Sequence, residues 1–443
     1  MKKSLYVCEV CGYESVRWLG RCPNCQTWHS LKEVSQKRNA ESQLREKPLV
    51  ICDEEVEEDR IILGIDEMDR VLGGGLTRGS SVLLGGDPGI GKTTLCFQIA
   101  SRIVEIDHKC LYVSGEESPK QLLSRKKRLN LRYNFPVLST SNLHDIIEAT
   151  KETSYDLVIV DSIQSIFNPE VPSIPGGIAQ LKDVSIKLVK HFKEKDTAHI
   201  LIGHVTKEGQ IAGPKMIEHL VDTVLYFEGE RILPYRILRV TKNRYGPVDE
   251  IGIFQMTKEG LLGVKNPSEY FISEKKIESS GSALFPYVSG SRPIIVEIQA
   301  ITPRSNFSNP RRVALGYDLN RLYILSAVLE KALGKSFFDR DIYVNITGGI
   351  KIGEPAADLP VAAAILSSVG DFKIKKDVAF FGEVGLTGEI RRVLYAENRM
   401  KECSRIGIKK VFGPKGLPKL KGIEVIQIED IKELHERLLN LSS

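Results

Sequence analysis

The sequence predicts an α/β protein whose central domain holds a parallel sheet, preceded by a small cysteine-rich module and followed by a separate α+β domain. Three observations predict this organisation. A glycine-rich stretch at 86–94 links an apolar run to a helical pattern, short β-branched runs alternate with amphipathic helices up to residue 264, and two Cys-x-x-Cys pairs stand near the start of the chain. We therefore expect a module at 1–34, a linker at 35–59, and domains at 60–264 and 265–443.

The composition suits a globular protein with two or three domains. The chain has 443 residues and a formal net charge of +5, which permits a nucleic-acid partner without requiring one. No apolar run approaches the length of a membrane span, and the basic N-terminus is not followed by the apolar core of a signal peptide. Four of the eight cysteines are scattered, which is typical of a reducing compartment. We expect a cytoplasmic protein without a membrane partner.

The stretch Gly86-Asp87-Pro88-Gly89-Ile90-Gly91-Lys92-Thr93-Thr94 fits the phosphate-loop pattern G-x-x-x-x-G-K-T. Its glycines allow a tight turn in which backbone N–H groups approach phosphates, and Lys92 reaches the β- and γ-phosphates. The helix that begins here directs its positive end at the same anions. All nine residues are therefore candidates for binding ATP, and Thr93 is a candidate ligand of Mg²⁺.

Acidic residues follow two later strands of the same domain. The β-branched run 155–162 contains Asp161, the carboxylate expected to hold Mg²⁺ through water. Since no glutamate follows Asp161 directly, we expect the group that activates water on the neighbouring strand. That strand spans 110–114 and leads to Glu116 and Glu117. The sequence leaves open which of the two glutamates acts.

This placement of the glutamates resembles the RecA-like ATPases and differs from ATPases that carry an Asp-Glu pair on one strand. The resemblance implies that His204, after a further apolar strand, senses the γ-phosphate. A histidine with a purely structural role at a strand end is the alternative. The resemblance also implies that the polar loop 209–215, which includes Lys215, contacts single-stranded DNA.

The pentapeptide Lys242-Asn243-Arg244-Tyr245-Gly246 makes the resemblance more specific. After a RecA-like core and a four-cysteine module, it resembles the K-N-R-(F/Y)-G signature of the bacterial RadA (Sms) recombination family, with Tyr245 in the place of the usual Phe. The resemblance implies that Lys242 and Arg244 reach the nucleotide of a neighbouring subunit and neutralise charge in the transition state. A solvent-exposed basic turn is the alternative.

The N-terminal module carries four cysteines that can converge on one ion: Cys8, Cys11, Cys22 and Cys25. Four thiolates bind Zn²⁺ tetrahedrally, so we expect a structural zinc site. A redox-active pair and a rubredoxin-like iron site are the alternatives. Trp18 and Trp28 either stack on nucleic acid or cover the zinc site. The following linker is polar and ends in an acidic run at 53–59, which we expect to be a solvated tether.

The last domain resembles the proteolytic domain of Lon over 341–360 and 382–389. A Lon-type protease needs a serine nucleophile and a lysine that accepts its proton. Ala356 stands at the position of the nucleophile and Glu397 near that of the lysine, so we expect a fold kept as a ring-building scaffold without peptide hydrolysis. Four cations, three of them in one polar loop, are candidate contacts to DNA phosphates, with an ordinary surface role as the alternative: Arg304, Arg311, Arg312 and Lys351.

In combination, these resemblances predict a RecA-like P-loop NTPase core with a small N-terminal zinc module and a C-terminal α+β Lon-protease-like domain. They imply a DNA-stimulated ATPase that uses ATP, Mg²⁺ and Zn²⁺ and assembles as a hexameric ring. It would bind single-stranded and branched DNA and work beside RecA, promoting branch migration as a helicase-like motor in recombination and repair. Two other functions stay open: an ATP-dependent protease, which Ala356 disfavours, and an ATP-driven scaffold that never contacts DNA.

Overall fold

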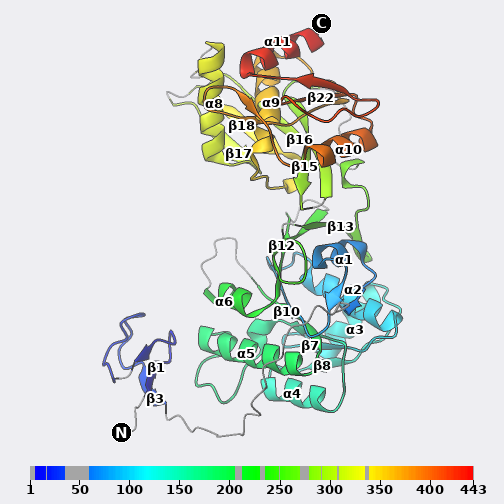
Figure 1. Ribbon diagram of the computed structural model, residues 1–443. Coiled ribbons are helices and arrows are strands. Elements are labelled where there is room, and N and C mark those ends of the chain that lie inside the picture. Colours follow the sequence, from blue (N-terminus) through cyan, green and yellow to red (C-terminus); the bar gives the residue numbers. More distant parts are fainter. Residues whose placement is uncertain are drawn as a thin grey trace, which may run out of the picture. The chain divides into compact units, whose positions relative to one another are not determined.

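The computed structural model of the chain (Figure 1) forms two compact units, which are described separately here. The first comprises the chain up to Glu228 with 238–248 and 256–263, and the second comprises 229–237, 249–255 and 264–443. The predicted linker, except Asp59, and most of the predicted DNA-contacting loop lie outside the described residues. The structure describes residues 5–15, 17–34, 59–204, 212–229, 235–248, 250–269, 279–290, 292–306, 309–334 and 339–442.

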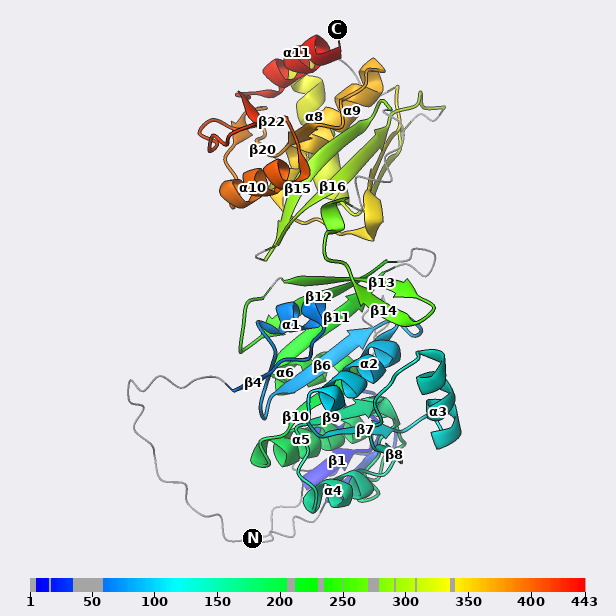
Figure 2. The same cartoon turned by 90° about the vertical axis from the view of Figure 1, so that its right-hand side faces the viewer.

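The first unit is built on parallel strands in the order β11-β6-β10-β9-β7-β8, which Figure 2 shows from the side. Their bounds are β6 Ser81–Gly86, β7 Cys110–Ser114, β8 Val137–Ser139, β9 Leu157–Asp161, β10 Ala198–Ile202 and β11 Thr223–Glu228. The parts of β12 (Tyr235–Asn243) and β13 (Ile251–Thr257) that belong to this unit follow β11 in the sheet, with β14 (Gly260–Gly263). A short antiparallel pair, β4 (Arg60–Ile61) and β5 (Leu76–Thr77), precedes them.

Helices cover both faces of this sheet, as strands that are apolar along their whole length require. The side chains of Leu111 and Val113 share one core with α4 (Leu143–Lys151), α5 (Ile178–Glu194) and the end of α6 (Ala212–Leu220). Tyr112 alternates to the opposite face, where its ring meets Phe97 of α2 (Lys92–Glu105). The remaining helices of the unit are α1 (Asp66–Leu72), η1 (Ile163–Ser165) and α3 (Pro119–Arg128). Thus the parallel-sheet prediction is confirmed.

The second unit has a mixed sheet in the order β17-β18-β16-β15-β19-β22-β23. These strands are β15 Ser282–Ser289, β16 Arg292–Ile301, β17 Arg312–Leu315, β18 Ile342–Ile346, β19 Val378–Phe380, β22 Lys410–Gly413 and β23 Glu424–Gln427. A small antiparallel pair, β20 (Glu383–Val384) and β21 (Ile390–Arg391), lies apart from the main sheet. The helices are α8 Leu319–Leu333, η2 Thr347–Gly349, η3 Pro355–Ala357, α9 Asp358–Gly370, α10 Ala396–Ile406 and α11 Ile431–Ser442.

The N-terminal module is a small antiparallel sheet in the order β2-β1-β3, formed by β1 (Leu5–Cys8), β2 (Glu14–Ser15) and β3 (Leu31–Val34). Among the described residues, its buried hydrophobic core consists of Cys8, Cys22 and Leu31, with a few half-buried neighbours. A core of this size cannot stabilise a domain without help, and binding of a metal would supply on the order of 10 kcal/mol.

Most sequence-predicted elements are found close to their expected bounds. The α3 helix begins at Pro119 behind a capping box formed by Ser118 and Gln121. Arg312 differs from expectation, because it belongs to β17 rather than to a polar loop. Residues 312–315 pair in parallel with β18, and this pairing draws them out of the loop into the sheet edge. Among the described residues, we find no helix that is both long and apolar enough to span a membrane.

Candidate nucleotide-binding site

The phosphate loop joins β6 to α2 through glycines that no other residue could replace. Gly86 has φ of 146°, and a Cβ atom built there would lie 2.5 Å from the Phe227 carbonyl oxygen of β11. The loop ends at Gly91, the N-cap of α2. The first N–H groups of a helix have no partners within it, so the predicted residues Gly86 to Thr94 enclose a set of donors that suits a bound phosphate.

The Lys92 side chain is folded into this loop. Its Nζ donates hydrogen bonds of 2.7 Å to the Gly86 carbonyl oxygen and 3.0 Å to that of Asp87, and lies 3.3 Å from Nδ1 of His204. Only 4% of the residue is exposed, and burial lowers the pKa of Lys92 to about 8, although Asp161 opposes the shift. The ammonium group therefore lies where phosphate charge would favour its protonated form.

Asp161 ends β9 and accepts two hydrogen bonds on one oxygen. Thr93 Oγ1 donates to Oδ2 over 2.7 Å, and the Tyr112 hydroxyl donates to the same atom over 2.6 Å. The structure thus brings together the two residues predicted to hold Mg²⁺. Burial raises the pKa of Asp161, and burial also raises the pKa of Tyr112 far above its ordinary value, so the phenol keeps its proton and acts as the donor.

Sequence reasoning missed Tyr112. The tyrosine stands in the apolar run of β7, where the pattern indicates only a buried strand. Its register opposite Ile159 of β9 places the side chain two residues from Asp161 on the neighbouring strand. The only available signal was that a buried tyrosine hydroxyl usually finds a hydrogen-bond partner.

Glu116 and Glu117 differ in their surroundings, although both follow β7. Ser162 Oγ donates a 2.6 Å hydrogen bond to Glu116 Oε1, which lies 3.9 Å from His204 Nε2. Glu117 instead forms an ion pair with Arg125 of α3. Glu116 therefore belongs to the cluster around Lys92 and Asp161, whereas the Glu117 carboxylate is held by a helix outside that cluster.

His204 lies two residues beyond the end of β10 and contacts the cluster with both ring nitrogens. Its backbone carbonyl accepts a 3.1 Å hydrogen bond from the Gln164 side chain. Burial and the nearby Lys92 ammonium lower the pKa of His204, so the imidazole is neutral at physiological pH. The ring stands between the phosphate-loop lysine and a carboxylate, where a change in either partner would reach it.

Lys242 and Arg244 form contacts within their own subunit. Lys242 Nζ donates to the carbonyl oxygens of Glu218 (2.8 Å) and Val221 (2.6 Å), at the carboxyl end of α6. Arg244 pairs with the buried Asp222 over 3.1 Å, yet 56% of its side chain is exposed. Both cations thus lie at the end of β12, with Lys242 inside the strand and Arg244 directly after it.

The four predicted zinc ligands converge in the N-terminal module. Their sulfur atoms all lie within 4.8 Å of one another, with 3.5 Å between Cys8 and Cys25 and 3.4 Å between Cys11 and Cys22. Four thiolates at such spacing fit the tetrahedral site that Zn²⁺ prefers.

The two tryptophans of this module are both exposed to solvent. Trp18 is 55% exposed and Trp28 is 65% exposed, and the Arg21 guanidinium lies over the Trp28 ring at 5.7 Å. Both rings are thus accessible to solvent, and stacking on nucleic acid and cover of the zinc site both stay predictions.

Known families match three separate parts of the chain. Residues 6–33 match a family described as the rubredoxin metal binding domain, residues 61–153 match the KaiC ATPase family, and residues 323–416 match subunit ChlI of Mg-chelatase. The three matches fall on the cysteine module, the phosphate-loop half of the sheet and the C-terminal domain. The flagellar accessory protein FlaH from Methanocaldococcus jannaschii aligns with a TM-score of 0.39 and 18% identity, covering 47% of this chain and 99% of FlaH.

Relatives of nearly equal length share the whole arrangement. The DNA repair protein RadA of Bacillus subtilis (strain 168) is 44% identical over 446 residues, which cover 97% of each chain. That of Aquifex aeolicus (strain VF5) is 43% identical over 441 residues, covering 98% of this chain and 99% of the relative. The chain belongs to the RadA family. The zinc-type module, the RecA-like core and the Lon-like domain are thus parts of one RadA architecture.

Three of the predicted DNA-contacting cations of this RadA-family chain gather at one end of the mixed sheet. Arg304 and Arg340 are bridge partners, Arg312 donates a 2.8 Å hydrogen bond to the Arg340 carbonyl oxygen, and Arg311 immediately precedes β17. Lys351 follows η2, beyond the opposite end of β18, so the structure separates it from the arginines. Arg340 was missed by sequence reasoning. The side chain of Lys215 lies outside the described residues.

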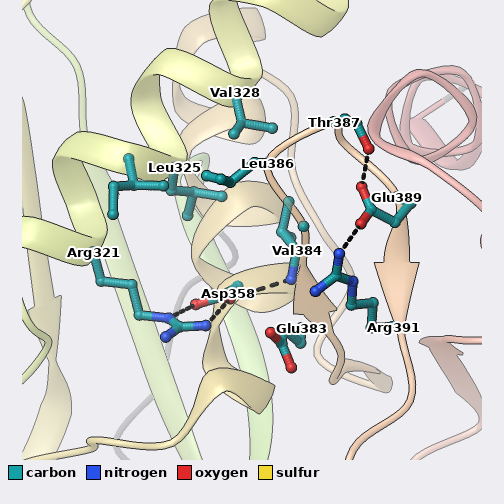
Figure 3. A pocket seen from close by; sticks show the side chains of 12 residues that line it. Arg321, Leu325, Val328, Asp358, Glu383, Val384, Leu386, Thr387, Glu389 and Arg391 are labelled. Carbon is teal, nitrogen blue, oxygen red and sulfur yellow. Dashed lines mark hydrogen bonds and ion pairs between the residues drawn. The ribbon is translucent and has the colours of Figure 1, made fainter.

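The described residues that line the hollow near Ala356 do not supply the serine and lysine of a Lon-type protease. Ala356 is buried in η3, and its carbonyl oxygen accepts a 3.0 Å hydrogen bond from Gly382. Two residues later, Asp358 lines a hollow of about 300 Å³ between α8, α9 and β20 (Figure 3). No serine, cysteine or lysine is among its described lining residues. Four of its charged groups form two pairs, Arg321 with Asp358 over 2.6 Å and Arg391 with Glu389.

Proposed function

We propose that this RadA-family chain is a Mg²⁺-dependent ATPase that acts in DNA repair and recombination. One observation carries the proposal: four side chains of complementary chemistry meet where the parallel strands end, namely Lys92, Thr93, Asp161 and Glu116. Together they offer a cation for phosphates, two oxygen ligands that suit Mg²⁺, and a carboxylate for water. The relatives named DNA repair proteins support the biological role.

In the proposed mechanism the chain holds ATP and activates water. The amino end of α2 and Lys92 bind the phosphates, while Thr93 and Asp161 hold Mg²⁺, which when bound stabilises negative charge on the phosphate oxygens. Glu116, oriented by the hydroxyl of Ser162, accepts the proton of the attacking water. His204 links this carboxylate to Lys92 and is placed to sense the γ-phosphate.

The neighbouring subunit completes the site in this proposal. Lys242 and Arg244 project from the end of β12, and the exposed guanidinium of Arg244 is free to leave a single ion pair for a more highly charged partner. In a hexameric ring, these cations reach the phosphates bound by the next copy and neutralise transition-state charge. When Lys242 moves to these phosphates, it would lose its hydrogen bonds to the Glu218 and Val221 carbonyl oxygens and so release the end of α6.

We further propose single-stranded and branched DNA as partners, with RecA-made intermediates as substrates of branch migration. The arginine cluster at one end of the mixed sheet supports contact with phosphates, and Lys215 and Lys351 are separate candidates. Peptide hydrolysis is not proposed, because Ala356 has no hydroxyl group and no lysine is among the described residues that line the nearby hollow. Glu397, in α10, forms an ion pair with Lys401.

The experiment is an ATPase assay on the purified chain with and without single-stranded DNA at moderate salt. We expect hydrolysis that DNA stimulates and that Lys92→Ala abolishes. Equal rates with and without DNA would favour the scaffold that never contacts DNA, and an active Lys92→Ala variant would overturn the phosphate-loop assignment. A casein-cleavage assay on the same preparation tests the protease alternative, for which we expect no product.

A further inference from the structure

A hollow of about 380 Å³ opens at the outer edge of the nucleotide-binding domain, where α3 meets β8. Its walls are largely apolar and include Phe97 of α2, Leu122 of α3 and Phe135. Two further lining residues are exposed to water, Leu123 at 54% and Val137 at 39%. The nucleotide site uses none of these exposed apolar groups. We call this hollow and the adjoining strand β8 the α3 groove.

The β8 strand gives the α3 groove an open backbone edge. Among the described strands, β7 is its only partner, through the register Tyr112↔Val137 to Ser114↔Ser139. Val137 and Ser139 are exposed, while Leu138 between them is half-buried. An edge strand offers alternate N–H and C=O groups to another extended segment, and adjacent pockets select its side chains.

The α3 helix beside the groove is strongly basic. The α3 helix carries five basic residues, and three of them are exposed and have no ion-pair partner in the described part of the chain: Lys120, Lys127 and Arg128. Lys126 lines the hollow itself and donates to the Asn134 side chain over 2.8 Å. An occupant of this groove should therefore combine apolar side chains with a run of negative charge.

One segment of this same chain has that composition. Leu49-Val50-Ile51 is an apolar, largely β-branched run that favours an extended strand, and five acidic residues follow within the next seven positions: Asp53, Glu54, Glu55, Glu57 and Glu58. We infer that residues 49–58 of one copy dock in the α3 groove of a second copy, with 49–51 beside β8 and the acidic run along α3.

We assign the segment to the groove of a second copy because the chain runs directly from residue 58 into β4 of its own domain. Only eight residues separate Ile51 from the start of β4 at Arg60. Figure 2 shows β4 and α3 at opposite ends of the nucleotide-binding domain. To reach its own groove, the segment would have to cross the domain, and eight residues span at most about 26 Å even when fully extended. A second copy can instead place its groove beside β4.

The groove also lies against the wall of the nucleotide site. The Phe97 ring packs edge-on against Tyr112 at 4.6 Å between centroids, and the Tyr112 hydroxyl holds Asp161. Arg125 lies 6.0 Å over the Phe97 ring and pairs with Glu117. The inference rests on the proposed assembly of copies and adds to it a specific contact, which joins each copy to the next beside the metal-binding carboxylate.

Cross-linking between two different chains tests this contact. One chain carries Val137→Cys with Cys52→Ser, and the other is a size-tagged wild-type chain whose Cys52 lies within the docking segment. After mixing and treatment with a short bis-maleimide, we expect a species that contains both chains, since a link from the thiol introduced at position 137 to Cys52 must then join two copies. The species should be lost when the tagged chain carries Cys52→Ser, which excludes a link through the zinc-module cysteines.

A matched control uses Ile186→Cys on α5, where Ile186 is 42% exposed. This helix contacts β10, which lies three places from β8 in the sheet order. We expect loss of the mixed species with this variant. Leu123→Glu should weaken both the cross-link and the sedimenting assembly, while Ile186→Glu should leave them unchanged. Thermal melts of both glutamate variants verify that the domain stays folded.

Three results would overturn the inference. In the first, assemblies sediment normally but give no more mixed species than the Ile186→Cys control. This result would rule out the groove contact and leave the ATPase proposal intact. A link confined to single chains, seen as altered mobility of a Val137→Cys chain that keeps its own Cys52, would place the segment in its own groove. Protection of the thiol introduced by Val137→Cys when single-stranded DNA is added, without any mixed species, would make the basic α3 surface a nucleic-acid contact instead.

Discussion

Tyr112 on β7 donates its phenolic hydrogen to Oδ2 of Asp161 on β9, over 2.6 Å, and this oxygen also accepts the hydrogen bond from Thr93. The proposed metal-binding carboxylate is thereby held from two sides, by Thr93 of α2 and by Tyr112 of β7. Groups that orient a metal ligand in this way affect metal affinity almost as strongly as the ligand does.

Tyr112→Phe should raise the Mg²⁺ concentration needed for half-maximal ATP hydrolysis by about 10-fold or more. The substitution keeps the ring that packs on Phe97 and removes only the donor to Asp161. Titration of the ATPase rate with Mg²⁺ at saturating ATP measures the shift. An unchanged Mg²⁺ requirement would show that Thr93 alone orients the carboxylate.

Glu116→Gln and Glu117→Gln should have very different effects on hydrolysis. Loss of a general base costs about 10²-fold to 10⁴-fold in kcat, so we expect that loss for Glu116→Gln, with nucleotide binding retained. Glu117→Gln breaks an ion pair with Arg125 at the surface of the site and should change kcat by only a few-fold. Steady-state kinetics and binding of a fluorescent nucleotide measure both quantities. The opposite order of effects would assign the water to Glu117.

The choice between these glutamates illustrates what the sequence could and could not predict. The phosphate loop and Asp161 follow from local patterns, because a strand, a turn and a helix start are close together along the chain. The partners that distinguish Glu116 from Glu117 are Ser162, 46 residues away, and Arg125 on α3. Nothing local in the sequence indicates which carboxylate each partner will meet.

Two other residues show the same limit. In sequence, Tyr112 is one member of a buried apolar run, and only the register between β7 and β9 directs its hydroxyl to a carboxylate. Arg312 looked like part of a polar loop, yet parallel pairing with β18 made it the first residue of an edge strand. Long-range strand pairing decided both cases, and periodicity within one segment does not contain that information.

ATP binding should take up a proton above pH 8. Burial lowers the pKa of Lys92 to about 8, and the phosphates would raise it again, so the free lysine is neutral above pH 8 and is charged in the complex. Affinity should be unaffected by this group below pH 8 and fall as the pH rises above it. Calorimetry at pH 9 in two buffers of different ionisation enthalpy measures the uptake. Lys92→Arg, which stays charged, should abolish the difference between buffers.

Substitution of the arginine cluster should weaken DNA binding uniformly across sequences. Arg304→Ala with Arg340→Ala removes two cations from one end of the mixed sheet. The slope of log K against log salt concentration for single strands should therefore decrease in magnitude by about 0.7 for each lost phosphate contact. Lys351→Ala tests the separate candidate beyond the other end of β18 in the same way. Fluorescence anisotropy over a salt series measures the slope. An equal loss with Lys351→Ala would contradict a site confined to the arginines.

Mixing two inactive variants tests whether Arg244 acts on a neighbouring subunit. Lys92→Ala removes the cation that holds phosphates, and Arg244→Ala removes an exposed cation at the end of β12. In an assembly of both variants, some interfaces join an intact phosphate loop to an intact Arg244, so ATPase activity should return although each variant alone is inactive. Titration of one variant into the other should give a maximum at intermediate ratios. If Arg244 served only its own ion pair with Asp222, every mixture would stay as inactive as its components.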